Sequence, residues 1–333
     1  MTREPASGRT DKDLRAAIDA AVWAPSVHNT QPWRFSVRGS TISLRADADR
    51  RLEVADPDGR EMLLSCGAAL YTLRLALRAE GYRPETVVLP DPDRPHLVAD
   101  VHVAEGDAIE DADVRRLYAQ IERRRTHRGA FVDEPVGAPV LAGLHYEAEA
   151  EGARLVQAIE MHTKGALAAL TQAADHVQRR SRQYMSETAR WAPAPGSTRA
   201  EGVPQESYPQ QSPRTEPHFP TRDFARGHGW GVHVEPPEDA LLTGAVLLLV
   251  TGSDEPRDWV RAGQALQRVL LRATEAGLAA AFHTQALEIP ELRDFVRDRF
   301  CAGAHPQMIL RLGTAAGPGF ATVRRAADVT EEG

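Results

Sequence analysis

Apolar residues recur along this chain with two different periods. Steps of three and four residues predict amphipathic helices. The first begins near Asp11 and ends before Pro25, and the others cover 58–82, 111–122, 137–149, 161–190, 262–278 and 290–299. Alternating or short continuous apolar runs predict strands at 33–37, 41–45, 85–89, 97–103, 155–159, 246–251, 279–283 and 308–312. Because helices and strands do not alternate strictly along the chain, the pattern favours an α+β fold over a doubly wound parallel sheet.

Two of the predicted helices, the second and the sixth in chain order, repeat one another. Gly67 and Gly263 lie inside them, and they end at Gly81 and Gly277. One constant offset aligns both pairs of glycines, as an internal duplication would. We expect the two helices to approach closely at Gly67 and Gly263 and to form the centre of an intramolecular pseudo-dimer. Two unrelated amphipathic helices that each end in glycine remain the alternative.

The polar stretch 104–111 predicts the boundary between the halves, so that residues 1–108 form the first half and 109–333 the second. Residues 181–240 interrupt the second half with nine prolines, which prevent long helices and central strands. Six aromatic residues give this insertion more apolar mass than a disordered linker usually has: Tyr184, Trp191, Tyr208, Phe219, Phe224 and Trp230. We therefore expect an ordered lid that covers a site.

The composition narrows the class of partner. The chain has 333 residues, with 40 basic and 47 acidic side chains and a formal net charge of −7, which disfavours nucleic acid. The longest apolar run, 245–250, is too short to span a membrane, and no secretory signal is visible, so we expect a cytoplasmic protein without a membrane partner. Cys66 and Cys301 are far apart, and no His, Cys or carboxylate cluster has metal-ligand spacing, so we expect no metal and interpret both cysteines as buried filler.

The stretch 24–35 reads APSVHNTQPWRF and ends a helix with turn residues before a strand begins. Pro25 terminates the helix, and Ser26 and Asn29 offer short polar side chains to local amides or to a ligand. This stretch resembles the PSxxNxQPW element of the nitroreductase family, whose members bind FMN in a crevice between two subunits. The resemblance implies that Pro25, Ser26, Val27 and Asn29 contact the flavin.

A basic run, RRRTHR, follows a predicted helix at 123–128. Arginine forms paired, charge-assisted hydrogen bonds to phosphate oxygens, and a threonine hydroxyl adds a donor between them. A solvated charged face or a nucleic-acid patch would also explain such a run taken alone. The run resembles the R-x-S-x-R/K element of nitroreductases, which implies flavin phosphate contacts by Arg124, Arg125, Thr126 and Arg128, with Thr126 in place of the usual serine.

Two further stretches of the chain resemble nitroreductases. His283, Thr284 and Gln285 follow the second repeated helix, where nitroreductases run their backbone past the flavin N5. Arg324 and Arg325 lie near the C-terminal end, where the family places further basic residues against the same phosphate. A solvated, charged tail is the competing interpretation of these two arginines.

The order of these elements resembles the Acg subgroup of nitroreductases, fused proteins in which a lid covers the flavin. This implies one FMN per chain and a monomeric pseudo-dimer. Two functions remain open at this point. The first is an oxidoreductase that takes a hydride from NAD(P)H and passes it to a flat acceptor, a nitroaromatic or a quinone. The second is a protein that binds and sequesters FMN beneath a closed lid with little or no turnover.

Overall fold

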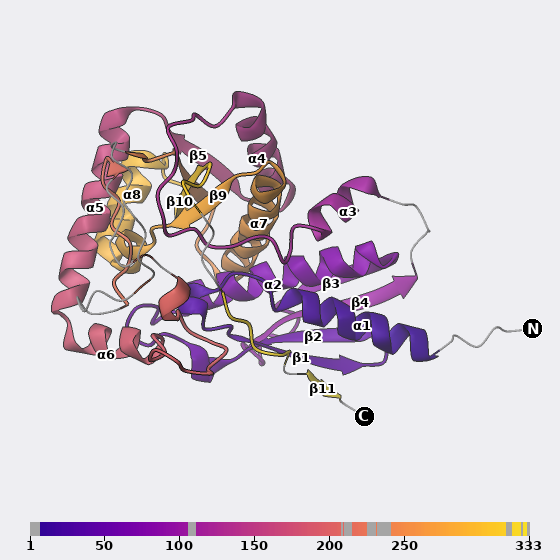
Figure 1. Ribbon diagram of the computed structural model, residues 1–333. Helices are drawn as coiled ribbons and strands as arrows, with labels where there is room; N and C mark the ends of the chain where they lie inside the picture. Colours follow the sequence, from indigo (N-terminus) through magenta and orange to yellow (C-terminus); the bar gives the residue numbers. More distant parts are fainter. Residues whose placement is uncertain are drawn as a thin grey trace, which may run out of the picture.

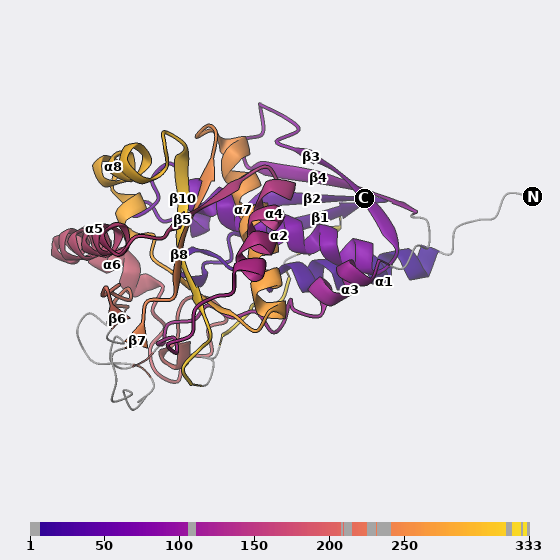
Figure 2. The ribbon, with the colours of Figure 1, turned by 90° about the horizontal axis from the view of Figure 1, so that it is seen from above.

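The molecule contains two largely antiparallel sheets that flank a central pair of helices (Figure 1). The computed structural model describes residues 7–105, 111–207, 209, 215–224, 231, 241–317, 322–327 and 329–331. Its mixture of helices and largely antiparallel strands confirms the predicted α+β class. Figure 2 shows the two sheets on opposite sides of the helix pair.

The first sheet has five strands in the order β11–β1–β2–β4–β3, and its edge strand β11 comes from the C-terminal end of the chain, outside the predicted first half. Its strands are β1 (Trp33–Arg38), β2 (Thr41–Ala46), β3 (Tyr82–Val88), β4 (Leu97–Glu105) and β11 (Val329–Glu331). Helix α2 (Arg60–Ala79) packs on this sheet, and α1 (Ser7–Ala21) and α3 (Ala112–Tyr118) pack against α2. The Asp56 carboxylate accepts hydrogen bonds from the first-turn amides of α2, and Gly81, at φ 90°, permits the chain to turn after the helix.

The second half contains a four-stranded sheet in the order β5–β8–β10–β9. Its strands are β5 (Arg154–Ala158), β8 (Ala245–Thr251), β9 (Ala279–Phe282) and β10 (His305–Gly313). Its helices are α4 (Ala138–Ala150), α5 (Met161–Arg180), α6 (Arg182–Arg190), α7 (Pro256–Glu275) and α8 (Pro290–Phe300). Strand β8 has the sequence AVLLLVT and is buried throughout, because helices cover both faces of the sheet at its centre.

The two halves repeat one order of elements. The sheet orders β1–β2–β4–β3 and β5–β8–β10–β9 correspond strand for strand, with antiparallel pairing at every step. Helices α2 and α7 are each 20 residues long and occupy the same place in this order. The offset that aligns Gly67 with Gly263 also aligns the first and last residues of these helices. The topology thus supports the duplication predicted from the glycine pattern.

Helices α2 and α7 cross at the two glycines. A Cβ added to Gly67 would lie 2.1 Å from the carbonyl oxygen of Val260, and one added to Gly263 would lie 1.9 Å from the carbonyl oxygen of Leu64. Any side chain would therefore push the two backbones apart. The close approach predicted at these positions is confirmed.

Helix α2 is also long and apolar enough to cross a membrane by length and composition. However, 83% of its most apolar window is buried inside the protein. It is therefore best described as the core helix of the first half. Cys66, on this helix, and Cys301 are both buried free thiols, in agreement with their prediction as small buried side chains.

The structure differs from the sequence prediction in several places. The helix predicted over 161–190 breaks at Ser181, whose hydroxyl accepts a hydrogen bond from the Tyr184 amide and begins α6. The pattern did not predict β11, which pairs in parallel with β1, nor the short pair β6 (Thr215–Glu216) and β7 (Leu241–Leu242). Residues 106–110 of the predicted linker, Tyr208 and Trp230 lie outside the described residues.

We predict that Gly263→Ala destabilises the protein, because its methyl group would overlap backbone of α2. Overpacking of this kind costs on the order of 1–3 kcal/mol. The matched control is Gly143→Ala on α4, where an added Cβ meets nothing within 4 Å and where alanine should favour the helix by up to about 1 kcal/mol. Urea unfolding measures both variants; equal stability of Gly263→Ala and the wild type would contradict a tight crossing.

Candidate functional site

The loop after α1 holds its backbone in an unusual conformation. His28, Asn29 and Gln31 have φ angles of 46°, 53° and 51°, in the left-handed region that residues other than glycine seldom adopt. Ser26 Oγ accepts a hydrogen bond from the Gln31 amide at 3.0 Å, and the Val27 amide donates to Ser65 Oγ of α2 at 3.1 Å. Strain of this kind persists where surrounding contacts enforce it, and it is frequent at functional sites.

Four arginines from two distant segments meet beside this loop. Arg124, Arg125 and Arg128 follow α3, whereas Arg324 lies in the C-terminal arm that returns to the first half and ends in β11 (Figure 1). Arg324 Nη1 donates to Asn29 Oδ1 at 2.8 Å. Asn29 thus orients a guanidinium that belongs to the opposite end of the sequence.

Three of the four arginines in this arginine cluster lack an ion-pair partner in the described part of the chain, although the charge of Glu122 acts on Arg125. Within the described part of the chain, Arg124, Arg125 and Arg324 form no ion pair, and Arg124 Nε and Nη1 and Arg324 Nε are buried without a hydrogen-bond partner. Burial, followed by repulsion from Arg324, Arg125 and Arg128, lowers the pKa of Arg124. Burial and repulsion from Arg125 and Arg128 lower the pKa of Arg324 to about 9. Since arginine stays protonated in proteins, this arrangement favours a bound anion.

Three arginines of the cluster, Arg125, Arg128 and Arg324, line a narrow cavity with an empty space of about 380 Å³. Its polar lining combines guanidiniums with hydroxyl and amide groups that can donate hydrogen bonds. The lining residues are Pro25, Ser26, Asn29, Arg125, Thr126, Arg128, Gly202, Val203, Ser207, Thr322 and Arg324. This donor set suits a phosphate group.

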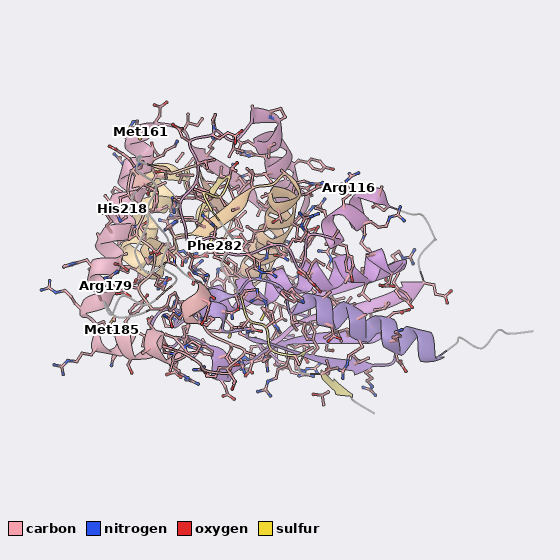
Figure 3. The ribbon with its side chains drawn as sticks, in the orientation of Figure 1. Arg116, Met161, Arg179, Met185, His218 and Phe282 are labelled. Carbon is pink, nitrogen blue, oxygen red and sulfur yellow. The ribbon has the colours of Figure 1, made fainter. Side chains whose placement is uncertain are left out.

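A wider cavity continues from the narrow one, because Pro25, Ser26, Thr126 and Arg128 line both. Its empty space, including the open mouth, is about 860 Å³, within the size range of small-molecule sites. Phe282, at the end of β9, lies near the middle of the molecule (Figure 3) and lines this cavity. Further apolar lining comes from both halves: Val27, Leu64, Leu266, Ala281 and Met308. We call this space the ring cavity, because its apolar lining can enclose a flat ring system.

His283, Thr284 and Gln285 form one wall of the ring cavity. Arg311 Nε donates to His283 Nε2 at 2.8 Å, so the ring proton lies on Nδ1, which donates to the Pro220 carbonyl oxygen at 3.2 Å. Burial, followed by the charge of Arg311, lowers the pKa of His283. This histidine is therefore a neutral and fixed part of the wall.

Three residues of the segment predicted as a lid, Thr221, Arg222 and Phe224, line the ring cavity. Arg222 forms an ion pair with Glu288 of the short helix η4 (Gln285–Glu288) and donates to Thr284 Oγ1. The Phe224 ring meets the His28 ring edge to face, with 5.1 Å between centroids. Segment 215–224 thus covers the ring cavity, and its contacts include the ion pairs Arg222–Glu288 and Asp223–Arg179 and the ring contact of Phe224 with His28.

The structure brings most of the predicted site residues to these two cavities. Pro25, Ser26, Val27, Asn29, Arg125, Thr126, Arg128, His283, Thr284, Gln285 and Arg324 line one or both. Arg124 lies buried behind the lining, within the arginine cluster. Arg325 lines neither cavity, and its Nη2 donates to the Trp33 carbonyl oxygen at 2.9 Å.

The sequence analysis did not select several lining residues. The most important are His28, Glu61, Ser65, Arg222 and Phe224. Glu61 and Ser65 belong to a helix whose apolar pattern predicts only which residues pack in the core. The lid residues belong to a segment that has no periodic pattern. Within the described residues, no group of three or more His, Cys, Asp or Glu side chains could hold a metal ion.

No family model matches the chain. It is 37% identical over 307 residues to "Putative NAD(P)H nitroreductase Rv3131" of Mycobacterium tuberculosis (strain ATCC 25618 / H37Rv), an alignment that covers 91% of this chain and 85% of that protein. The chain belongs to the nitroreductase family. Within this family it is similar to "Putative NAD(P)H nitroreductase acg" of the same organism, with 32% identity over 302 residues, 91% of this chain and 89% of that protein. It is therefore an Acg-like nitroreductase.

Solved structures of nitroreductases show a weaker likeness. One from Anabaena variabilis ATCC 29413 gives a TM-score of 0.49 at 13% identity, over 94% of this chain and 90% of that one. One from Bacteroides fragilis NCTC 9343, crystallised with bound FMN, gives 0.39 at 12% identity, over 64% of this nitroreductase and 97% of that chain. The family assignment rests on the two mycobacterial relatives.

We predict that Arg124→Met does not lower the stability of the anion-free protein but weakens its stabilisation by phosphate. Without an anion the variant should be as stable as the wild type or more stable, because it removes a buried and repelled charge. Inorganic phosphate should raise the melting temperature of the ligand-free wild type and have a much smaller effect on the variant. Differential scanning calorimetry measures both, with exposed Arg15→Gln as the control. Equal stabilisation of Arg124→Met and wild type by phosphate would contradict the anion site.

Proposed function

We propose that this nitroreductase binds one FMN per chain, with the phosphate in the narrow cavity and the isoalloxazine in the ring cavity. The observation that carries the proposal is the arginine cluster, where four guanidiniums converge on one end of a continuous cavity and Arg124 has unpartnered buried N–H groups. FMN has the matching form, since a ribityl chain joins its dianionic phosphate to a flat ring system. The FMN-bound nitroreductases among the solved structures are consistent with this choice.

Residues of both halves would bind the cofactor, some at its phosphate and others at its ring. Arg125, Arg128 and Arg324 would bind phosphate oxygens, and Asn29 would keep Arg324 in place. Val27 on one side and the wall His283–Gln285 on the other would enclose the ring. Bound FMN would supply hydride transfer, for which the protein provides position and electrostatic environment.

We infer an oxidoreductase that takes a hydride from NAD(P)H and gives it to a flat acceptor, a nitroaromatic or a quinone. The names of the two mycobacterial relatives support NAD(P)H as the donor. The apolar lining of the ring cavity supports a flat aromatic acceptor that stacks on the ring. Cytoplasmic location and a monomeric pseudo-dimer remain predictions that accompany this proposal.

Sequestration of FMN is a second candidate function, and the lid is the observation that favours it. Arg222 binds Glu288, and Phe224 packs on His28 over the cavity. A lid held in this way could exclude both NAD(P)H and acceptor. The two functions differ in whether bound flavin turns over.

We predict that Arg124→Ala combined with Arg128→Ala releases the flavin and leaves the fold intact. The double variant removes two of the four charges that would hold the phosphate. Absorbance of the purified protein and its circular dichroism measure flavin content and fold. The matched control is Arg15→Ala combined with Arg299→Ala, both exposed. A double variant that keeps its yellow colour would disprove the phosphate assignment.

Anaerobic stopped-flow mixing with NADPH or NADH separates the two candidate functions. For an oxidoreductase we predict that the flavin absorbance bleaches within a turnover time, and that menadione restores it. Phe224→Ala should accelerate both phases if lid opening limits access. Absence of bleaching in the wild type, with bleaching in Phe224→Ala, would favour sequestration instead.

A further inference from the structure

Three buried carboxylates lie where α2 begins, at the edge of the ring cavity. Glu61 lines the cavity and is 4% exposed, Asp56 is equally buried, and the Glu288 side chain is 1% exposed. Asp56 accepts hydrogen bonds from the amides of Glu61 and Met62 at 3.0 and 2.8 Å. Glu288 binds Arg222 of the lid. Of the three carboxylates, only Glu61 faces the space where an acceptor would bind.

The charges of this carboxylate cluster do not balance. Two guanidiniums, Arg60 and Arg222, act on the three carboxylates. The next groups outward, Arg293 and Asp254, form an ion pair at 2.6 Å and add no net charge. One carboxylate is therefore in excess within the described residues, and burial disfavours an uncompensated charge. The cluster retains a proton near neutral pH.

Glu61 is the carboxylate of this cluster that lines the cavity. Glu61 and Glu288 each form an ion pair, Glu61 with Arg60 Nη2 at 2.8 Å and Glu288 with Arg222 of the lid, whereas Asp56 accepts from two amides while burial raises its pKa. Burial, followed by repulsion from Glu288, raises the pKa of Glu61 to about 8, against the opposing effect of Arg60. Glu61 thus lies at the cavity surface with a raised pKa, in a cluster that holds a proton.

Another polar side chain in the ring cavity, His28, lacks a hydrogen-bond partner in the described part of the chain. His28 is 7% exposed, and neither of its ring nitrogens forms a hydrogen bond within the described residues. Burial, followed by the charges of Arg222 and Arg128, lowers the pKa of His28, so it is a neutral imidazole. An unpartnered buried imidazole in the same cavity indicates that the ligand has polar atoms on this side.

We infer that Glu61 is a catalytic acid that protonates the acceptor during its reduction, an inference that rests on the proposed function. A quinone that receives one hydride becomes a neutral hydroquinone only when an oxygen also receives one proton. The O–H bond of the Glu61 carboxyl breaks, and the proton forms a new O–H bond on the acceptor. The flavin supplies both electrons, and Glu61 regains its proton from water through the cavity mouth.

The lid contributes to this step through Arg222. When the lid is closed, Arg222 adds a positive charge that favours ionised Glu61. When the lid opens, the charge leaves and Glu61 holds its proton more tightly. Closure over an acceptor therefore promotes release of the proton at the moment when the acceptor is enclosed.

The test uses the full chain with bound flavin, reduced by light in the presence of EDTA and then mixed anaerobically with menadione. We expect E61Q to slow flavin reoxidation by at least about tenfold, since a positioned acid typically contributes a factor of 100 or more. The wild-type rate should fall as the pH rises through about 8, and the E61Q rate should lose this dependence. E61D should recover part of the rate, and E80Q, exposed at the other end of α2, should match the wild type.

Two further measurements separate chemistry from a structural role. The midpoint potential of the bound flavin is compared in the wild type and E61Q, because a change of driving force alone would also alter the rate. Infrared difference spectra between about pH 6 and about pH 10 should show a protonated carboxyl in the wild type that is missing in E61Q. A band that persists in E61Q would assign the proton elsewhere and overturn the inference.

The outcomes distinguish this inference from the proposed function. Equal reoxidation rates in E61Q and the wild type, or a slowing explained by the midpoint potential, would overturn the role of Glu61 and leave the oxidoreductase proposal intact. A chain that NAD(P)H does not reduce, but whose photoreduced flavin shows the Glu61 dependence, would contradict the nicotinamide donor and support the acid.

Discussion

The close crossing of α2 and α7 is the constraint on which the rest of the structure depends. At Gly67 and Gly263 the two backbones approach to distances that leave no room for a methyl group. This crossing sets the first half directly against the second, so that the strained loop after α1 meets the arginines that follow α3. Both crossing helices also line the ring cavity, through Leu64 of α2 and Leu266 of α7. The site is therefore a product of the contact between the halves.

The cavity between the halves has opposite charge excess at its two ends. In the described residues, Arg124, Arg125 and Arg324 form no ion pair at the narrow end, whereas three carboxylates exceed two guanidiniums where α2 begins. Neither excess stabilises the folded chain, because burial of like charges costs free energy. An anion at one end and a retained proton at the other relieve both. This polarity would orient an asymmetric cofactor and place a proton donor beside its reactive ring.

Local patterns predicted the helices, most strands and the loop motif, because helical periodicity and turn residues act over short distances. The predicted helix 58–82 and the observed Arg60–Ala79 differ by a few residues, and the paired glycines predicted the helix crossing. Tertiary placement was harder to predict: Arg222, Phe224 and Glu61 reach the cavity through long-range contacts that leave no periodic signal. Asn29 was selected as a ligand residue, yet its side chain also orients Arg324, a contact between opposite ends of the sequence.

The most direct test of the central claim compares FMN with riboflavin, which lacks the phosphate. Isothermal titration of the flavin-free chain with each compound, at equal ionic strength, measures what the arginine cluster contributes. Two charge-assisted hydrogen bonds of about 1.5 kcal/mol each should make FMN bind at least about a hundredfold more tightly. Equal affinities for the two compounds would contradict a site built around a phosphate.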